Sequence, residues 1–278
     1  MKKIAFIGAG SMAEAMISGI VENKLLAGEQ IWVTNRNNQE KLDRLNQKYG
    51  VNGTYDLSEL MENADAVILA MKPKEAATGI SQIRPYLTEN TMIISVLAGV
   101  SIDSIQLLAQ KEIPVVRAMP NTSATVGKSA TGFAINSNVS EHQKQVVQTI
   151  FETVGLTTFV EENQLDAVTG LSGSGPAYIY YLIEAMEKGA SEIGLEKEVA
   201  KDLIVQTLLG AAEMVAKSSK PSQQLRAEVT SPGGTTEAGL RVLESFEVQK
   251  AFINCIKEAT AQSKRLGIAL SDELYPVK

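Results

Sequence analysis

The chain has 278 residues, and 44% of them are hydrophobic, which is enough for one large domain or two smaller domains with proper cores. A formal net charge of −6 at pH 7 argues against a nucleic-acid-binding protein, which would carry a basic face. A single cysteine and a single histidine exclude an intramolecular disulfide and a Cys/His zinc cluster. A Ser-His-Asp triad would have to use that one histidine, which argues against triad hydrolysis.

The apolar stretches of the chain are short. None approaches the ~18 uninterrupted residues typical of a membrane span. The run that follows Met1-Lys2-Lys3 ends early in glycines and does not read as a signal peptide. We therefore expect a cytoplasmic protein that has no membrane, nucleic acid or metal ion among its partners.

Strand and helix patterns alternate through the first part of the chain. Short apolar runs that predict strands lie at residues 2–10, 30–36, 64–73, 91–99, 113–121, 130–135 and 157–162. Helical spacing of apolar residues predicts helices at 11–23 and 38–49. The runs within 64–73 and 91–99 are typical of strands buried on both faces. Strands separated by helices predict βαβ units, so we expect an α/β fold with a Rossmann-like, doubly wound and mainly parallel sheet.

Helical patterns replace strands after about residue 162. They cover residues 177–194, 197–218 and 252–268, with small residues recurring on their faces. We predict an α/β domain at 1–162 and an all-helical domain at 163–278. Two different cores on one chain also predict a cleft between the domains, which is a common place for a ligand.

A glycine-rich loop joins the first predicted strand to the first predicted helix. Gly8-Ala9-Gly10-Ser11-Met12-Ala13 has the G-x-G-x-x-A pattern of dinucleotide-binding proteins, in the strand–loop–helix context that this pattern requires. Gly8 permits a tight turn, Gly10 lets a pyrophosphate approach the backbone, and Ala13 allows close packing. The free N–H groups of the following helix favour phosphate. The alternative is a glycine turn that binds no ligand.

The end of the second predicted strand bears on the choice of cofactor. NAD sites usually carry an acidic residue there, but this chain has Thr34-Asn35-Arg36. Asn35 can donate hydrogen bonds, and Arg36 can pair with a 2′-phosphate. These residues favour NADP(H), with NAD(H) still possible. The alternative is that Arg36 points into solvent.

Two further strand ends are candidates for cofactor contacts. Residues 70–73, Ala-Met-Lys-Pro, and residues 95–99, Ser-Val-Leu-Ala-Gly, end the two buried strands. Ligands bind at the carboxyl ends of parallel strands. Lys72 can reach a ribose or phosphate, and residues 97–99 leave room for a flat ring.

A second glycine motif, "VTSPGGTTEAG", lies at residues 229–239. Ser231 can be a helix N-cap and Pro232 the first helical residue. Gly233 and Gly234 then fall in the first turn, where each costs up to ~1 kcal/mol relative to alanine. Capping alone does not explain them, so we interpret the segment as a turn whose N–H groups bind an anion such as a carboxylate. The alternative is a plain capped helix with a flexible entry.

The side chains of the same motif add further donors. Thr235 contributes a backbone N–H, while Ser231 and Thr236 contribute hydroxyls.

Three segments together resemble the pyrroline-5-carboxylate reductases: "IGAGSMAEA" (7–15), "GLSGSGPAYIYYLIEAM" (170–186) and "VTSPGGTTEAGLRVLE" (229–244). The resemblance extends essentially from Ile4 to the last predicted helix. It implies NADPH- or NADH-dependent reduction of 1-pyrroline-5-carboxylate to L-proline, the last step of proline biosynthesis. It also implies a homodimer or a ring of dimers, whose interlocking helical domains serve substrate binding and dimerisation.

The resemblance further implies roles for individual residues. In the family, the Ser-Pro-Gly-Gly-x-Thr turn holds the substrate carboxylate, and its last threonine, Thr236 here, hydrogen-bonds the ring nitrogen. Ser231, Gly233, Gly234 and Thr235 match the remainder of that turn. The family's cofactor contacts fall on Ile7, Gly8, Ala9, Gly10, Ser11 and Met12, on Ala70, Met71, Lys72 and Pro73, and on Val96, Leu97 and Ala98.

The residue inventory suits the reduction of an imine. A protonated C=N bond accepts hydride without a protein acid, so the protein mainly has to hold the two reactants together. A hydroxy-acid dehydrogenase must protonate an alkoxide and usually relies on a His or Lys. A β-hydroxyacid or 6-phosphogluconate-type dehydrogenase is nevertheless an alternative, although Lys188, Lys197 and Lys201 lie in charged, solvated stretches. A non-catalytic NADP(H) sensor is a second alternative.

Overall fold

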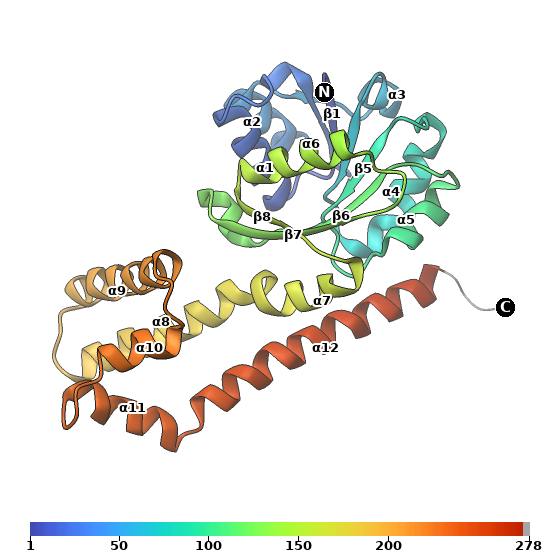
Figure 1. Ribbon diagram of the computed structural model, residues 1–278. Coiled ribbons are helices and arrows are strands. Elements are labelled where there is room, and N and C mark those ends of the chain that lie inside the picture. Colours follow the sequence, from blue (N-terminus) through green and yellow to red (C-terminus); the bar gives the residue numbers. More distant parts are fainter. Residues whose placement is uncertain (275–278) are drawn as a thin grey trace. The chain divides into compact units, whose positions relative to one another are not determined.

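The computed structural model describes residues 1–274, and the chain forms two compact units. One contains Met1–Pro176 together with the chain from Lys257 onward, and the other contains Ala177–Ile256. The first unit carries a large sheet with helices, and the second is entirely helical (Figure 1). The predicted α/β class with a following helical region is therefore confirmed, whereas the predicted domain limits, 1–162 and 163–278, stay a prediction.

The sheet is mostly parallel. Among the described residues it has eight strands, in the order β3-β2-β1-β4-β5-β6-β7-β8. Their bounds are β1 (Ile4–Ile7), β2 (Ile31–Thr34), β3 (Asn52–Gly53), β4 (Ala66–Leu69), β5 (Met92–Ser95), β6 (Val115–Met119), β7 (Ser129–Ile135) and β8 (Gly155–Phe159). Neighbouring strands are parallel except for the antiparallel pair β6 and β7. All seven strands that the sequence predicts are present; the two-residue β3 was not predicted, because two residues carry no period.

Helices cover both faces of the sheet (Figure 1). One face packs on α1 (Ser11–Glu22), α2 (Gln39–Tyr49) and α6 (Glu141–Glu152), and the other on α3 (Leu57–Met61), α4 (Ala76–Ile83) and α5 (Ile102–Ala109). Strand β1 shows the reason: Ile4 and Phe6 belong to one buried cluster, while Ala5 and Ile7 belong to the other. Side chains alternate along a strand, so a strand that is apolar at every position requires a helix layer on each side.

The chain after β8 is helical. It forms α7 (Leu165–Val168), a π-helical turn at Thr169–Gly173, α8 (Gly175–Glu192), α9 (Lys197–Lys217), α10 (Ser222–Glu228), α11 (Thr235–Ser245) and α12 (Val248–Leu274). Short 3-10 turns elsewhere are η1 (Gly28–Gln30), η2 (Pro73–Glu75), η3 (Arg84–Tyr86), η4 (Thr122–Val126) and η5 (Glu162–Gln164). Within residues 1–274, none of these helices combines the length and apolarity needed to cross a membrane. The same part of the chain has no cluster of His, Cys, Asp and Glu side chains suited to a metal ion.

The β7–β8 pairing depends on a glycine. Gly155 has φ +149°, and a Cβ built on it would lie 2.1 Å from the Ser129 carbonyl oxygen. We predict that Gly155→Ala destabilises the fold by about 3 kcal/mol or more, since it adds both backbone strain and overpacking. The measurement is urea unfolding. The matched control is Gly127→Ala, at φ +66° with open space around its Cβ, where only strain of about 1–2 kcal/mol applies. Equal losses in the two variants would contradict the steric explanation.

Candidate active site

The glycine loop sits tightly between two neighbouring strand ends. Gly8 has φ +113°, and a Cβ built on it would lie 2.6 Å from the backbone carbon and oxygen of Ala70. The Gly8 N–H donates to the Thr34 carbonyl at 2.9 Å, and the Ala70 N–H donates to the Ile7 carbonyl at 2.9 Å. Only glycine tolerates both the positive φ and this close approach. These two hydrogen bonds hold the loop between the ends of β2 and β4.

The helix that follows this loop begins with free backbone donors. Gly10 is the N-cap of α1 in an extended conformation, and none of the described side chains caps it. A Cβ built on Gly10 would meet only the Ala70 oxygen, at 3.9 Å, so Gly10 is less crowded than Gly8. Ser11 is exposed, while Ala13 is fully buried against the sheet. A helix N-terminus that has no side-chain cap and an exposed first residue fits the pyrophosphate of a dinucleotide.

One acidic residue lies in the first turn of that helix. Glu14 accepts hydrogen bonds from Lys41 and, at 2.9 Å, from Nη2 of Arg44, both on α2. The Lys41 hydrogen bond holds the pKa of the Glu14 carboxyl below its ordinary value. The carboxylate is therefore ionised and balanced by neighbouring cations, so it opposes an anion at the helix end less than a bare carboxylate would.

The end of β2 is followed by an exposed arginine, Arg36, and by an amide that stabilises the next turn, Asn35. The Asn35 side chain donates to the Asn38 carbonyl at 2.7 Å and accepts from the Asn38 N–H at 2.6 Å, which builds the turn into α2. The Arg36 side chain is 87% exposed, and its Nη1 lies 4.0 Å from Oε1 of Glu75 in η2. The sequence interpretation did not include Glu75. Nothing along the chain links it to Arg36, because the pair forms only through the fold, which places the ends of β2 and β4 on either side of the end of β1.

The other predicted cofactor residues lie at the same sheet edge. The Val96 N–H donates to the Leu69 carbonyl at 3.1 Å, which extends the β4–β5 pairing past the strand ends. Lys72 and Ala98 are exposed, whereas Leu97 is 2% exposed and belongs to the core. The ends of β1, β4 and β5 are thus brought together. Leu97 can support a ligand through its backbone or by packing beneath it, but its side chain is not open to solvent.

The turn at residues 231–234 corrects one expectation. Ser231 is not a helix N-cap and Pro232 is not the first helical residue, because α11 begins at Thr235 with Gly234 as its N-cap. The Gly234 N–H donates to the Ser231 carbonyl at 3.0 Å, and Gly233 has φ +73°. A Pro-Gly pair with a positive φ at the glycine forms a type II-like turn and cannot continue a right-handed helix. The two glycines therefore belong to the turn and to the cap.

This turn already holds a carboxylate. The Gly233 N–H donates to Oε2 of Glu237 at 2.8 Å, and Glu237 also lies 3.5 Å from Nη2 of Arg241. Thr235 and Thr236 are exposed, and the first turn of α11 has no side-chain cap among the described residues. One backbone N–H of the turn is thus able to bind a carboxylate, here that of Glu237. The sequence interpretation missed Glu237. Its role depends on the turn geometry, which directs the Gly233 N–H at the Glu237 carboxylate.

The helical unit leaves many large apolar side chains uncovered. Ile193, Phe246 and Tyr181 are 78%, 77% and 74% exposed. Others on the same unit are Ile179, Tyr180, Leu195, Val199, Leu203, Leu209, Met214, Val215, Val242, Leu243 and Ile253. Exposed apolar surface on this scale is typical of a region that associates with another protein chain.

The chain matches known families along most of its length. The family model described as pyrroline-5-carboxylate reductase dimerisation matches residues 162–266, and the one described as NADP oxidoreductase coenzyme F420-dependent matches residues 3–99. Pyrroline-5-carboxylate reductase 2 of Bacillus subtilis is 49% identical over 266 residues, which cover 96% of this chain and 95% of that protein. The chain belongs to the pyrroline-5-carboxylate reductase family.

Solved structures agree with this assignment. A pyrroline-5-carboxylate reductase from Coxiella burnetii has a TM-score of 0.88 at 40% identity, covering 95% of this chain and 98% of that one. Plasmodium falciparum pyrroline carboxylate reductase, solved with NADP bound, has a TM-score of 0.87 at 32% identity and the same coverage. The chain is therefore an NAD(P)-binding oxidoreductase of this family, which decides against the hydroxyacid dehydrogenase and sensor alternatives.

Proposed function

We propose that this chain reduces the C=N bond of 1-pyrroline-5-carboxylate to L-proline with a reduced nicotinamide nucleotide, the last step of proline biosynthesis. The observation that carries the proposal is the Ser231–Gly234 turn, in which a backbone N–H already binds a carboxylate at 2.8 Å. This turn occurs in a chain that is 49% identical to a Bacillus subtilis pyrroline-5-carboxylate reductase. A small carboxylate-bearing imine is the ligand that such a turn suits best.

Different residues of the turn are proposed to bind different parts of the substrate. The N–H groups at Gly233 and at the start of α11 bind the carboxylate, Gly234 closes the turn that presents them, and the Ser231 hydroxyl adds a donor. The Thr236 hydroxyl orients the ring nitrogen. The bound nucleotide supplies the hydride. Because a protonated imine brings its own proton, the chain's histidine, exposed at position 142 on α6, needs no part in the reaction.

We further propose NADPH as the preferred cofactor, with NADH also accepted. The exposed guanidinium of Arg36 and the lack of an acidic residue at the end of β2 support a contact with the 2′-phosphate. Glu75 is the one acidic group paired with that guanidinium among the described residues, and it would compete with a phosphate for it. The remaining contacts are those expected from the sequence at residues 7–12, 35–36, 70–73 and 96–98.

The proposed assembly is a cytoplasmic homodimer or a ring of such dimers. The uncovered apolar side chains of the helical unit support association through α8 to α12, the region that matches the dimerisation model. Burying them against a second copy would remove the unfavourable contact with water.

The direct test is oxidation of NADPH in the presence of 1-pyrroline-5-carboxylate, followed by the absorbance of the reduced nicotinamide, with NADH in parallel. We expect rapid oxidation that depends on the imine, and a higher kcat/KM for NADPH. Protein that binds NADPH and yet oxidises none in the presence of the imine would contradict the proposed activity.

Thr236 provides a prediction for the substrate site. Thr236→Ala should lower kcat roughly 10- to 100-fold, because the ring nitrogen loses a hydrogen bond to a charged group. NADPH affinity should not change, and Thr236→Ser should recover much of the rate. The matched control is Thr235→Ala, since Thr235 is expected to act through its backbone. If Thr235→Ala and Thr236→Ala lose the same amount of activity, the hydroxyl of Thr236 has no specific role.

Arg36 and Glu75 provide a prediction for cofactor choice. Arg36→Ala should lower kcat/KM for NADPH about tenfold and leave NADH nearly unchanged, as one charge-assisted phosphate contact is lost. Glu75→Gln should shift the ratio the other way, because a competing carboxylate is removed. Glu89→Gln, which makes the same charge change just before β5 on the opposite edge of the sheet, is the control. If the ratio of kcat/KM for NADPH to kcat/KM for NADH is unchanged in Arg36→Ala, the proposed contact of Arg36 with the 2′-phosphate is wrong.

Glu237 provides a prediction for the Ser231–Gly234 turn. The Glu237 carboxylate occupies the Gly233 N–H that a substrate carboxylate would use. Glu237→Gln should therefore lower KM for the imine about fivefold, corresponding to ~1 kcal/mol of removed competition and repulsion, with KM for NADPH unaffected. Glu244→Gln, an exposed charge change on the same helix, is the control. A higher KM in Glu237→Gln would mean that this carboxylate assists binding instead.

A further inference from the structure

The loop after β5 touches the last helix backbone to backbone. Gly99 has φ +76°, and a Cβ built on it would lie 3.3 Å from both Cα and N of Gly267 in α12. In the other direction, a Cβ built on Gly267 would lie 3.4 Å from the Gly99 carbonyl oxygen. Both residues belong to the same compact unit. Because both positions are glycine, the loop backbone contacts the backbone of α12 directly. The same loop contains residues 96–98, which are expected to contact the cofactor.

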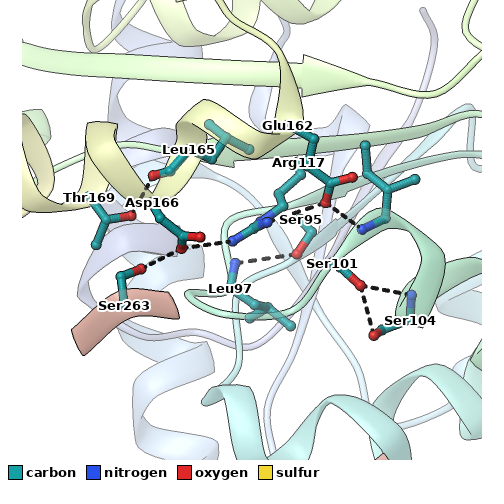
Figure 2. A network of polar contacts seen from close by, with 11 residues as sticks. Ser95, Leu97, Ser101, Ser104, Arg117, Glu162, Leu165, Asp166, Thr169 and Ser263 are labelled. Atoms are coloured by element: carbon teal, nitrogen blue, oxygen red, sulfur yellow. Dashed lines mark hydrogen bonds and ion pairs between the residues drawn. The ribbon is translucent and has the colours of Figure 1, made fainter. Parts of the chain in front are cut away.

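A chain of polar contacts ties the same helix to the end of that loop (Figure 2). The buried Ser263 of α12 donates to Oδ1 of Asp166 at 2.7 Å. That carboxylate lies 4.0 Å from Nη2 of Arg117, whose Nη1 lies 3.2 Å from Oε1 of Glu162. The same Glu162 oxygen accepts the N–H of Ile102, the first residue of α5, at 2.8 Å. The series runs without interruption from α12 to the residue where the loop becomes a helix.

The centre of this series is a buried cation. The Arg117 side chain is only 10% exposed and has carboxylates on two sides. A guanidinium removed from water requires such partners, so Asp166 and Glu162 cannot move away without leaving a buried charge unpaired. Arg117 also faces Ser95 in the β5–β6 register, and the Ser95 hydroxyl accepts the Leu97 N–H at 3.3 Å. The loop is thereby held near its start, its middle and its end.

We propose that Gly267 and Ser263 of α12 are positioning residues that hold the 96–101 loop in place for the nicotinamide half of the cofactor. The proposal rests on the cofactor contacts proposed above for residues 96–98. The adenosine half is expected to use the Gly8–Gly10 loop and Arg36, which lie outside the network. Displacing α12 from Gly99 therefore weakens contacts at one end of the dinucleotide and leaves the other end intact.

The experiment compares two ligands on the full-length protein: NADPH, which has both halves, and 2′,5′-ADP, which has only the adenosine half. Gly267→Val pushes against the Gly99 carbonyl, so its Kd for NADPH should rise about tenfold while its Kd for 2′,5′-ADP stays within about twofold of the wild-type value. Ser263→Ala should give a smaller change in the same direction, about threefold for NADPH. Lys264→Ala, at an exposed neighbouring position on α12, is the matched control and should bind both ligands normally.

The melting temperature of each variant distinguishes a positioning role of these residues from a role in folding. Gly267→Ala places its Cβ at an ordinary contact distance, 3.4 Å, from the Gly99 carbonyl oxygen and replaces a poor helix former with the best one, so its Tm should be equal to or above the wild-type value and both affinities should change little. Ser263→Ala decides the matter if Gly267→Val does not fold. Folded Gly267→Val or Ser263→Ala protein whose affinities for NADPH and 2′,5′-ADP are both unchanged, or both weakened by one factor, overturns the proposal. Wild-type protein that binds NADPH but reduces no imine overturns the proposed activity instead, and the binding comparison still decides the role of α12.

Discussion

The close approach of Gly8 to Ala70 is the constraint on which the proposed cofactor site depends. A Cβ built on Gly8 would lie only 2.6 Å from the Ala70 backbone, so the chain segments that follow β1 and β4 are in direct backbone contact. This contact turns the chain sharply enough that α1 begins at the same sheet edge where β4 and β5 end. A single added methyl group would force those segments apart and move the uncapped helix end away from the other strand ends. Gly8 thus determines how the ends of β1 and β4 and the start of α1 are placed relative to one another.

Both proposed anion-binding sites carry a carboxylate that would compete with the ligand. Glu75 lies beside Arg36, and Glu237 accepts the Gly233 N–H. In each case the internal partner satisfies a donor or a charge that would otherwise face solvent alone. A ligand gains only the difference between its own contact and the one that it replaces. Such a balance suits an enzyme that must release its products as readily as it binds its substrates, and it moderates affinity without altering the fold.

Local patterns allowed much of the architecture to be predicted. The apolar runs gave the correct strands because a strand buried on both faces must be apolar at consecutive positions, whatever its neighbours are. The Gly8–Gly10 loop was correctly predicted to join a strand to a helix, because both elements adjoin it in sequence. The start of α11 was wrong by a few residues, since Ser-Pro favours a helix N-terminus while the positive φ of Gly233 diverts the chain into a turn first. Several local preferences competed there, and only the folded backbone decided between them.

The sequence by itself determined the fold class, the glycine loop between β1 and α1, and the family, because each is encoded by residues that are contiguous or nearly so. The pairs Arg36–Glu75 and Gly99–Gly267, and the series from Ser263 to Ile102, were decided only by the tertiary structure. Their members are distant in sequence and carry no period or motif that would link them. Parallel pairing brings strand ends from different parts of the chain to one edge, and α12 returns to that edge after the whole helical unit. Long-range contacts of this kind follow from packing the entire chain, so no local pattern predicts them.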